Sequence, residues 1–316
     1  MRKRVSMNQV AETVLLAMMW IAQSASLVLL NKYILVVLGF KHVYTLALSH
    51  MATTSILSSV VMSVPMMTDY KVSAEEVSAR AHGKLIILGL AFAASLVLAS
   101  QALIYMDVPS VQMTKTLSPA LMYAGALASG LDNFSIPSMV SVAVVCGGVA
   151  ISLLGAANFT PAGVAFQLAS IALDCFRLVW LQIIMQQDDL RLDAFTTLAL
   201  LAPYAAMMLW CLASWFELAA ISTKYAHDHS IAVSILASSI LAFLLNWTSF
   251  AFIRATSAMN VSLTGVVKDL VLIFVGARLF GTSVTVTQLI GYAVAVVGVL
   301  AYHDLKRQGK ELRALK

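Results

Sequence analysis

The chain has few charged residues. Asp, Glu, Lys and Arg make up 11% of its 316 residues, and hydrophobic residues make up 60%. A soluble domain contains about 25% charged residues. A water-soluble core of this length cannot bury so much apolar surface, so the composition predicts a polytopic membrane protein.

The chain also lacks the motifs that carry most enzyme chemistry. Its three cysteines, Cys146, Cys175 and Cys211, fall within apolar segments and have neither metal-ligand nor disulfide spacing. No phosphate-binding glycine loop, zinc-protease helix or nucleophile elbow is present in the sequence. We therefore expect no enzyme activity, no cofactor and no metal site. The net charge of +5 comes from bases at the chain ends and in loops, which does not indicate nucleic-acid binding.

Apolar segments separated by polar or turn-forming breaks predict ten membrane-spanning helices. They lie near residues 10–31, 43–65, 84–106, 109–129, 136–155, 161–187, 194–216, 231–253, 257–279 and 285–303. With the N-terminus in the cytosol, most lysines and arginines fall on the cytosolic side, and only Lys41, Lys224 and Arg278 fall opposite. This asymmetry predicts cytosolic termini at both ends, which requires an even number of spans.

Two parts of the sequence follow the same plan. Residues 110–150 and 262–300 each have a polar start, a lysine within an apolar helix, a turn and a glycine-rich apolar helix. We therefore expect an all-α membrane protein of ten transmembrane helices in two inverted five-helix repeats, residues 1–157 and 158–316. Inverted repeats place a substrate site near the bilayer midplane.

Six charged residues lie inside the predicted spans: Lys32, Lys115, Asp174, Arg177, Lys268 and Asp269. A charge at mid-bilayer costs roughly 3 kcal/mol on insertion scales, so such residues usually face a partner, a cavity or a substrate. Lys115 and Lys268 occupy matching places in the two halves, and two converging lysines form an anion site. Pro119 has no amide hydrogen, which leaves the Lys115 carbonyl without its helical partner and predicts a local weakness beside the lysine.

The other candidate residues surround these lysines in the sequence. Thr264 and Gly265 lie one turn before Lys268, where glycine allows a ligand to approach the helix closely. Asp269 does not share a helical face with Lys268, so we expect it to pair across helices or to accept a hydrogen bond from the ligand. The full set of expected substrate-binding residues is Lys115, Lys268, Asp269, Thr114, Thr264, Gly265 and Asn246.

Four further residues are candidates for gating or pairing within the membrane. Asp174 and Arg177 are three residues apart, which favours a structural ion pair and leaves a gate or substrate role open. Lys32, followed by Tyr33, lies near the end of the first span, where it either reaches the interface or pairs with an acid as a gate.

An ordered set of short segments resembles the triose-phosphate translocator and nucleotide-sugar transporter family of the drug/metabolite transporter superfamily. The segments are Leu30–Leu35, Ser110–Pro119, Asn158–Gly163, Arg177–Val179, Leu201–Pro203, and Asn246 through Gly265–Asp269 to Val299. The resemblance implies ten helices, alternating-access exchange, and phosphate binding at Lys115 and Lys268. Plastid triose-phosphate members have an arginine after the second lysine, whereas this chain has Asp269. The Lys268–Asp269 pair resembles the branch of the family that contains Golgi and endoplasmic reticulum carriers.

We therefore expect an antiporter that exchanges a nucleotide sugar, most simply a UDP-sugar, for nucleoside monophosphate in a Golgi or endoplasmic reticulum membrane. The alternative is an antiporter of the same fold that exchanges sugar phosphate for inorganic phosphate. The expected partners are a phosphorylated small molecule, its counter-substrate and the lipid bilayer, and the sequence is compatible with a homodimer.

Overall fold

The computed structural model describes residues 7–63, 79–128, 133–156, 160–186, 194–217, 229–256 and 258–314, which form helices and no strand. The first half contains α1 (Met7–Lys32), the π-helix η1 (Tyr33–Val37), α2 (Val43–Ser63), α3 (Ala79–Tyr105), α4 (Val108–Lys115), α5 (Ser118–Ala128) and α6 (Ile136–Leu154). The second half contains α7 (Pro161–Gln186), α8 (Ala194–Phe216), α10 (His229–Ala255), α11 (Ala258–Phe280) and α12 (Val286–Ala314).

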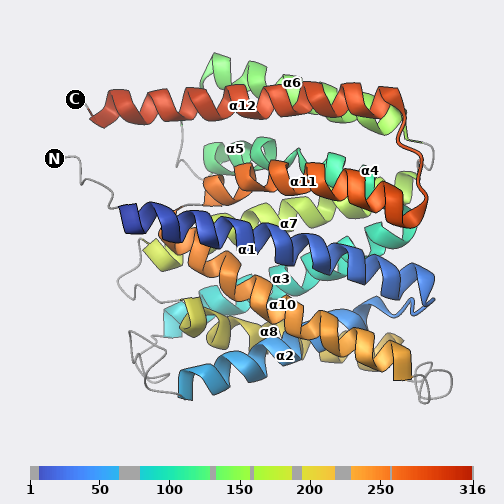
Figure 1. The fold of residues 1–316 in the computed structure, drawn as a ribbon. Helices are drawn as coiled ribbons and strands as arrows, with labels where there is room; N and C mark the ends of the chain where they lie inside the picture. Colours follow the sequence, from blue (N-terminus) through green and yellow to red (C-terminus); the bar gives the residue numbers. More distant parts are fainter. Residues whose placement is uncertain are drawn as a thin grey trace.

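The helices form a bundle whose two chain ends emerge on the same side (Figure 1). Among the described residues, eight helical segments are long and apolar enough to cross a membrane. The other two predicted crossings correspond to α4 with α5 and to α11. The first of these is split into two short helices, and the second carries Lys268 and Asp269, so neither is a continuous apolar span. The predicted all-helical, multi-span architecture is confirmed.

The pairing of helices repeats between the two halves. If α1, α2, α3, α4–α5 and α6 correspond to α7, α8, α10, α11 and α12, then α2–α8, α4–α11 and α6–α12 are pairs of equivalent helices. The α1–α10 pair then corresponds to α3–α7, and α2–α10 corresponds to α3–α8. This is the contact pattern of two repeats related by a pseudo-two-fold axis. The predicted boundary at residues 157/158 lies outside the described residues and stays a prediction.

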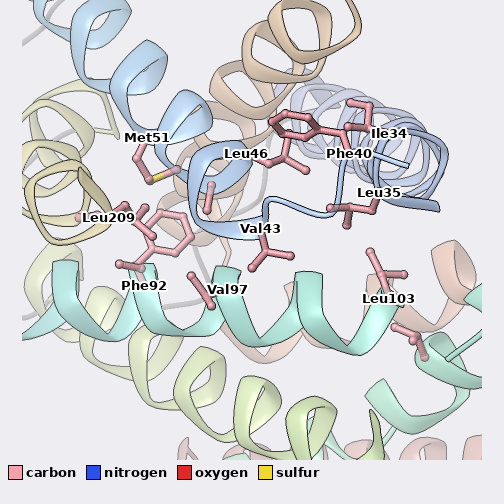
Figure 2. Close-up of a cluster of buried hydrophobic side chains, with 14 of the residues drawn as sticks. Ile34, Leu35, Phe40, Val43, Leu46, Met51, Phe92, Val97, Leu103 and Leu209 are labelled. Atoms are coloured by element: carbon pink, nitrogen blue, oxygen red, sulfur yellow. The ribbon is translucent and has the colours of Figure 1, made fainter. Parts of the chain in front are cut away.

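The first predicted span ends later than expected, because α1 continues into η1. The chain then turns at Gly39, whose φ of 69° lies in the left-handed region that favours glycine. Figure 2 shows the apolar cluster that follows, in which Ile34 and Leu35 of η1 pack with Val43 of α2 and Leu103 of α3. This cluster fixes the bundle at the end of α1 that is distant from the N-terminus.

A second apolar cluster lies nearer the chain ends. Trp20 of α1 packs there with Leu181 of α7, Leu198 of α8 and Phe252 of α10. The Trp20 indole also donates a 2.8 Å hydrogen bond to the Ser249 hydroxyl of α10. Between these two places, α1 packs Ala25, Leu29 and Leu30 against the first cluster. Other side chains of the same stretch, from Trp20 to Asn31, line the central cavity.

Candidate functional site

The helix that carries Lys115 is broken immediately after it. The Asp107 carboxylate caps the start of α4 by accepting a 2.7 Å hydrogen bond from the Ser110 amide. The helix ends at Lys115, and α5 begins at Ser118. The sequence predicted a weakness here because of Pro119. The structure corrects one detail, since the Lys115 carbonyl is not free but accepts a 2.7 Å hydrogen bond from the Ser118 hydroxyl.

This break has an electrostatic consequence for Lys115. As the last residue of α4, Lys115 lies at a helix C-terminus, where the negative end of the helix dipole favours a cation. No ion pair joins Lys115 to an acid within the described residues, and its side chain lines the central cavity. Lys115 is therefore a cation whose charge faces the cavity uncompensated.

Lys268 has a different environment on α11. Its ammonium nitrogen lies 2.9 Å from Oδ1 of Asp269, 3.5 Å from Oε1 of Gln112 on α4, and 5.8 Å from the centre of the Trp20 ring. Both charged side chains are buried. The lysine is thus held between an acid, an amide oxygen and an aromatic face.

The pairing of Lys268 with its own neighbour corrects the sequence-based expectation for Asp269. Adjacent residues point to different sides of a helix, but the long lysine side chain bends back to reach the carboxylate. The separation is that of an ion pair, yet Asp269 Oδ1 receives no hydrogen bond of suitable geometry from any described residue. The carboxylate therefore balances charge while keeping an acceptor available.

One cavity of about 270 Å³ brings most of the predicted residues together. It is lined by parts of α1, α2, α3, α4–α5, α7, α10 and α11, so both halves of the chain contribute to it. The predicted residues in its wall are Lys115, Lys268, Asp269, Gly265, Asn246, Asp174 and Arg177.

The Asp174–Arg177 pair lies in the wall on α7. The guanidinium donates hydrogen bonds of 2.6 and 3.1 Å to Asp174 Oδ1 and stacks 4.2 Å from the centre of the Phe92 ring on α3. The arginine is buried, whereas about half of the aspartate side chain is accessible (47%). The predicted pairing is present, and the arginine also ties α7 to α3.

Four predicted residues do not line this cavity, namely Thr114, Thr264, Tyr33 and Lys32. The Thr114 hydroxyl donates a 2.8 Å hydrogen bond to the Ser110 carbonyl on its own helix, because Thr114 points about 100° away from Lys115 around α4. Thr264 is likewise absent from the wall, although Gly265 beside it is present. Tyr33 is an exposed residue of η1.

Among the described residues, no acid lies within 4 Å of the Lys32 ammonium. Lys32 is buried, and its ammonium donates hydrogen bonds of 2.6 Å to the Leu103 carbonyl and 2.9 Å to the Met106 carbonyl. These carbonyls lie at or just beyond the C-terminus of α3, where helices leave acceptors unsatisfied. Lys32 therefore joins α1 to α3 and lies beside a second, separate cavity.

Sequence reasoning missed several polar residues in the wall, among them Asn31, Gln112 and Thr116. Gln112 lies three residues before Lys115, so the helical period alone places it on the same face. Asn31 and Thr116 are uncharged, so the cost of placing a charge in the membrane, which identifies Lys32 and Lys115, does not identify them.

An all-helical bundle of apolar segments around a polar, cation-bearing cavity defines a multi-span membrane transporter. The sequence model of the Triose-phosphate Transporter family matches residues 11–303. The chain therefore belongs to the triose-phosphate transporter family, which is a family of transporters and not of enzymes.

Two relatives from Arabidopsis thaliana are each named a probable sugar phosphate/phosphate translocator. One is 30% identical over 291 residues, covering 92% of this chain and 82% of the relative. The other is 28% identical over 301 residues, covering 93% of this chain and 87% of the relative. A solved crystal structure of a protein matches with a TM-score of 0.58 at 14% identity, covering 94% of this chain and 98% of that one. At this identity the likeness shows the fold alone.

Proposed function

We propose that this protein is an antiporter that exchanges a sugar phosphate for inorganic phosphate. The observation that carries the proposal is the cavity in which Lys115 and Lys268, from different halves of the chain, line one wall. The relatives' names support the same substrate class. The proposal takes the sugar-phosphate alternative of the sequence analysis in place of the nucleotide sugar expected first.

The charges of the wall suit an anion of this kind. Three cations, Lys115, Arg177 and Lys268, and two carboxylates, Asp174 and Asp269, line the cavity. The two carboxylates each lie beside a cation, at 2.6 and 2.9 Å. Lys115 therefore supplies the uncompensated charge that attracts a phosphate, and Lys268 supplies a second donor.

The size of the cavity also favours a compact substrate. Small-molecule sites span about 300–1,000 Å³, and this cavity holds about 270 Å³. A sugar phosphate concentrates its charge on one phosphoryl group and fits such a volume better than a nucleotide sugar, which adds a second phosphate, a ribose and a base.

The same charges give a physical reason for exchange. Without substrate, the Lys115 charge would have to move relative to an apolar cluster such as the one around Trp20 when the halves rock past each other. Bound phosphate neutralises that charge and lowers the barrier in both directions. Transport is then coupled to the return of a second anion.

One observation favours nucleotide-sugar exchange as a second candidate. Asp269 stands in the wall at the position where plastid triose-phosphate members, by the resemblance above, have an arginine. A carboxylate there lowers the positive charge and accepts hydrogen bonds from ribose or base donors.

Orientation and location extend the proposal. Both termini lie on one side of the bundle (Figure 1), and the lysines and arginines near them favour the cytosol. Together with the resemblance of the Lys268–Asp269 pair to secretory-pathway carriers, this supports a Golgi or endoplasmic reticulum membrane.

The test is competition in liposomes. Purified protein is reconstituted with internal phosphate, and uptake of labelled phosphate is measured against glucose 6-phosphate, UDP-glucose and uridine monophosphate. The proposal expects glucose 6-phosphate to compete strongly and both nucleotides weakly. Strong competition by UDP-glucose and uridine monophosphate, with little by the sugar phosphate, would establish the second candidate instead.

A further inference from the structure

Four buried polar atoms of residues in the cavity wall have no hydrogen-bond partner in the part of the chain that the structure describes. They are Asn31 Oδ1, Gln112 Nε2, Thr116 Oγ1 and Asp269 Oδ1. About nine in ten buried polar atoms in proteins are hydrogen-bonded, so four such atoms around one cavity point to a polar ligand.

These atoms include both hydrogen-bond donors and acceptors, which indicates a ligand with an anionic part and a hydroxyl-bearing part. The Gln112 amide oxygen faces Lys268, so its amide nitrogen is the free donor, and a donor between two lysines matches a phosphate oxygen. Asn31 Oδ1 and Asp269 Oδ1 are acceptors only. Asp269 Oδ1 already lies 2.9 Å from the Lys268 ammonium. An ionised phosphate has no hydrogen to give Asn31 Oδ1, so this acceptor requires a hydroxyl group on the rest of the molecule.

The length of the cavity leaves room for both parts. Trp20 and Asn31 both line it and are eleven residues apart on α1, which is about 16 Å at 1.5 Å per residue. Lys268 lies against Trp20, at one end of this stretch. Asn31 lies at the other end, beside Lys32 and the C-terminus of α3.

We propose that Asn31 is a specificity residue that accepts a hydrogen bond from a sugar hydroxyl while Lys115, Lys268 and Gln112 bind the phosphate. This inference rests on the proposed function and names the residue that recognises the sugar part of the substrate. Thr116, whose hydroxyl also has no described partner, supplies a further contact to the sugar hydroxyl groups, whereas Asp269 lies beside Lys268 at the phosphate end. A phosphate ester without hydroxyl groups leaves Asn31 Oδ1 unpaired and binds less well.

The test uses two competitors of labelled phosphate exchange in liposomes: glucose 6-phosphate, which has hydroxyl groups, and methyl phosphate, which has none. For the wild type we expect glucose 6-phosphate to compete at lower concentration. The isosteric variant Asn31→Leu should reduce this preference about 3- to 10-fold, the loss of one or two hydrogen bonds, while competition by methyl phosphate is unchanged.

Two further variants make the result interpretable. Gln23→Leu is the matched control, because Gln23 is also on α1 and its Oε1 is also buried without a described partner, but it does not line the cavity. Its preference should equal that of the wild type. Thr116→Val removes a wall hydroxyl at constant volume and should also reduce the preference, which keeps the test decisive if Asn31→Leu does not fold.

The competition results distinguish a failure of this inference from a failure of the proposed function. A wild-type preference for glucose 6-phosphate that survives in both Asn31→Leu and Thr116→Val overturns this inference and leaves the proposed function standing. The same holds if Asn31→Leu weakens both competitors equally. A wild-type protein that does not exchange phosphate at all overturns the proposed function and the inference with it.

Discussion

Replacing Lys268 with methionine removes the ammonium group but keeps most of the side-chain volume. A phosphate about 4 Å from a lysine gains roughly 4 kcal/mol at an effective dielectric constant of 20. In the wild type, the Lys268 ammonium lies 2.9 Å from the Asp269 carboxylate. The substitution removes this ion-pair partner and leaves a buried negative charge that repels phosphate. We expect Lys268→Met to slow phosphate exchange in liposomes by at least about 100-fold, which corresponds to roughly 3 kcal/mol.

The same variant should also lose stability, because breaking a buried ion pair from one side costs about 3–5 kcal/mol. The double variant Lys268→Met/Asp269→Asn removes both charges and should recover much of that stability without recovering transport. Thermal unfolding in detergent measures the first effect, and a double-mutant cycle isolates the pair.

Arg278→Met is the matched control for this experiment. Arg278 is a cation on the same helix, exposed and outside the cavity, so its loss should change neither exchange nor stability beyond about 0.5 kcal/mol. Correctly inserted Lys268→Met protein that exchanges phosphate within about threefold of the wild type would refute the role of Lys268 as a phosphate ligand.

The remaining predictions address substrate class, helix packing and topology. Asp269→Arg should increase the preference for small phosphates, seen as a larger ratio than in the wild type between the concentrations of UDP-glucose and of inorganic phosphate that halve uptake, and an unchanged ratio would count against the role of this carboxylate. Lys32→Met leaves two buried carbonyls without their described donor and should lower the free energy of unfolding by about 1–3 kcal/mol; an unchanged melting temperature would argue that this link is unimportant. Gly291→Ala should destabilise the α6–α12 pair, because an added Cβ would clash with the backbone of Ser152, whereas Gly265→Ala meets only Trp20 at 3.8 Å and should fold normally; equal melting temperatures for the two variants would contradict this packing. Tags at both termini should be cleaved by protease added outside sealed vesicles, and protection of only one would contradict an even number of spans.

The fold was predictable because the membrane imposes strong rules on sequence. The length and spacing of the apolar segments locate the helices without knowledge of packing. The weakness beside Lys115 was also predictable, since proline removes a donor wherever it stands. The hydrogen bond from the Ser118 hydroxyl to the Lys115 carbonyl was not predictable, because it depends on a side-chain rotamer.

The site was predictable as a pair of lysines but not as a complete cavity. A charged residue in an apolar span is recognisable from the sequence. Asn31 and Thr116 are uncharged, and only the structure shows that their side-chain oxygens are buried without a described hydrogen-bond partner. Thr114 was expected in the wall because it adjoins Lys115, but adjacency in sequence turns a side chain by about 100° around the helix. The Lys268–Asp269 contact depends on a side-chain rotamer, which helical periodicity does not specify.

The most direct test of the account is uptake of labelled phosphate into liposomes with and without internal phosphate, for the wild type and for Lys115→Met. The account predicts rapid uptake only by the wild type and only into loaded liposomes, because the uncompensated Lys115 charge must be neutralised in each direction. Equally rapid uptake into empty liposomes, or by Lys115→Met protein, would contradict exchange at this cavity.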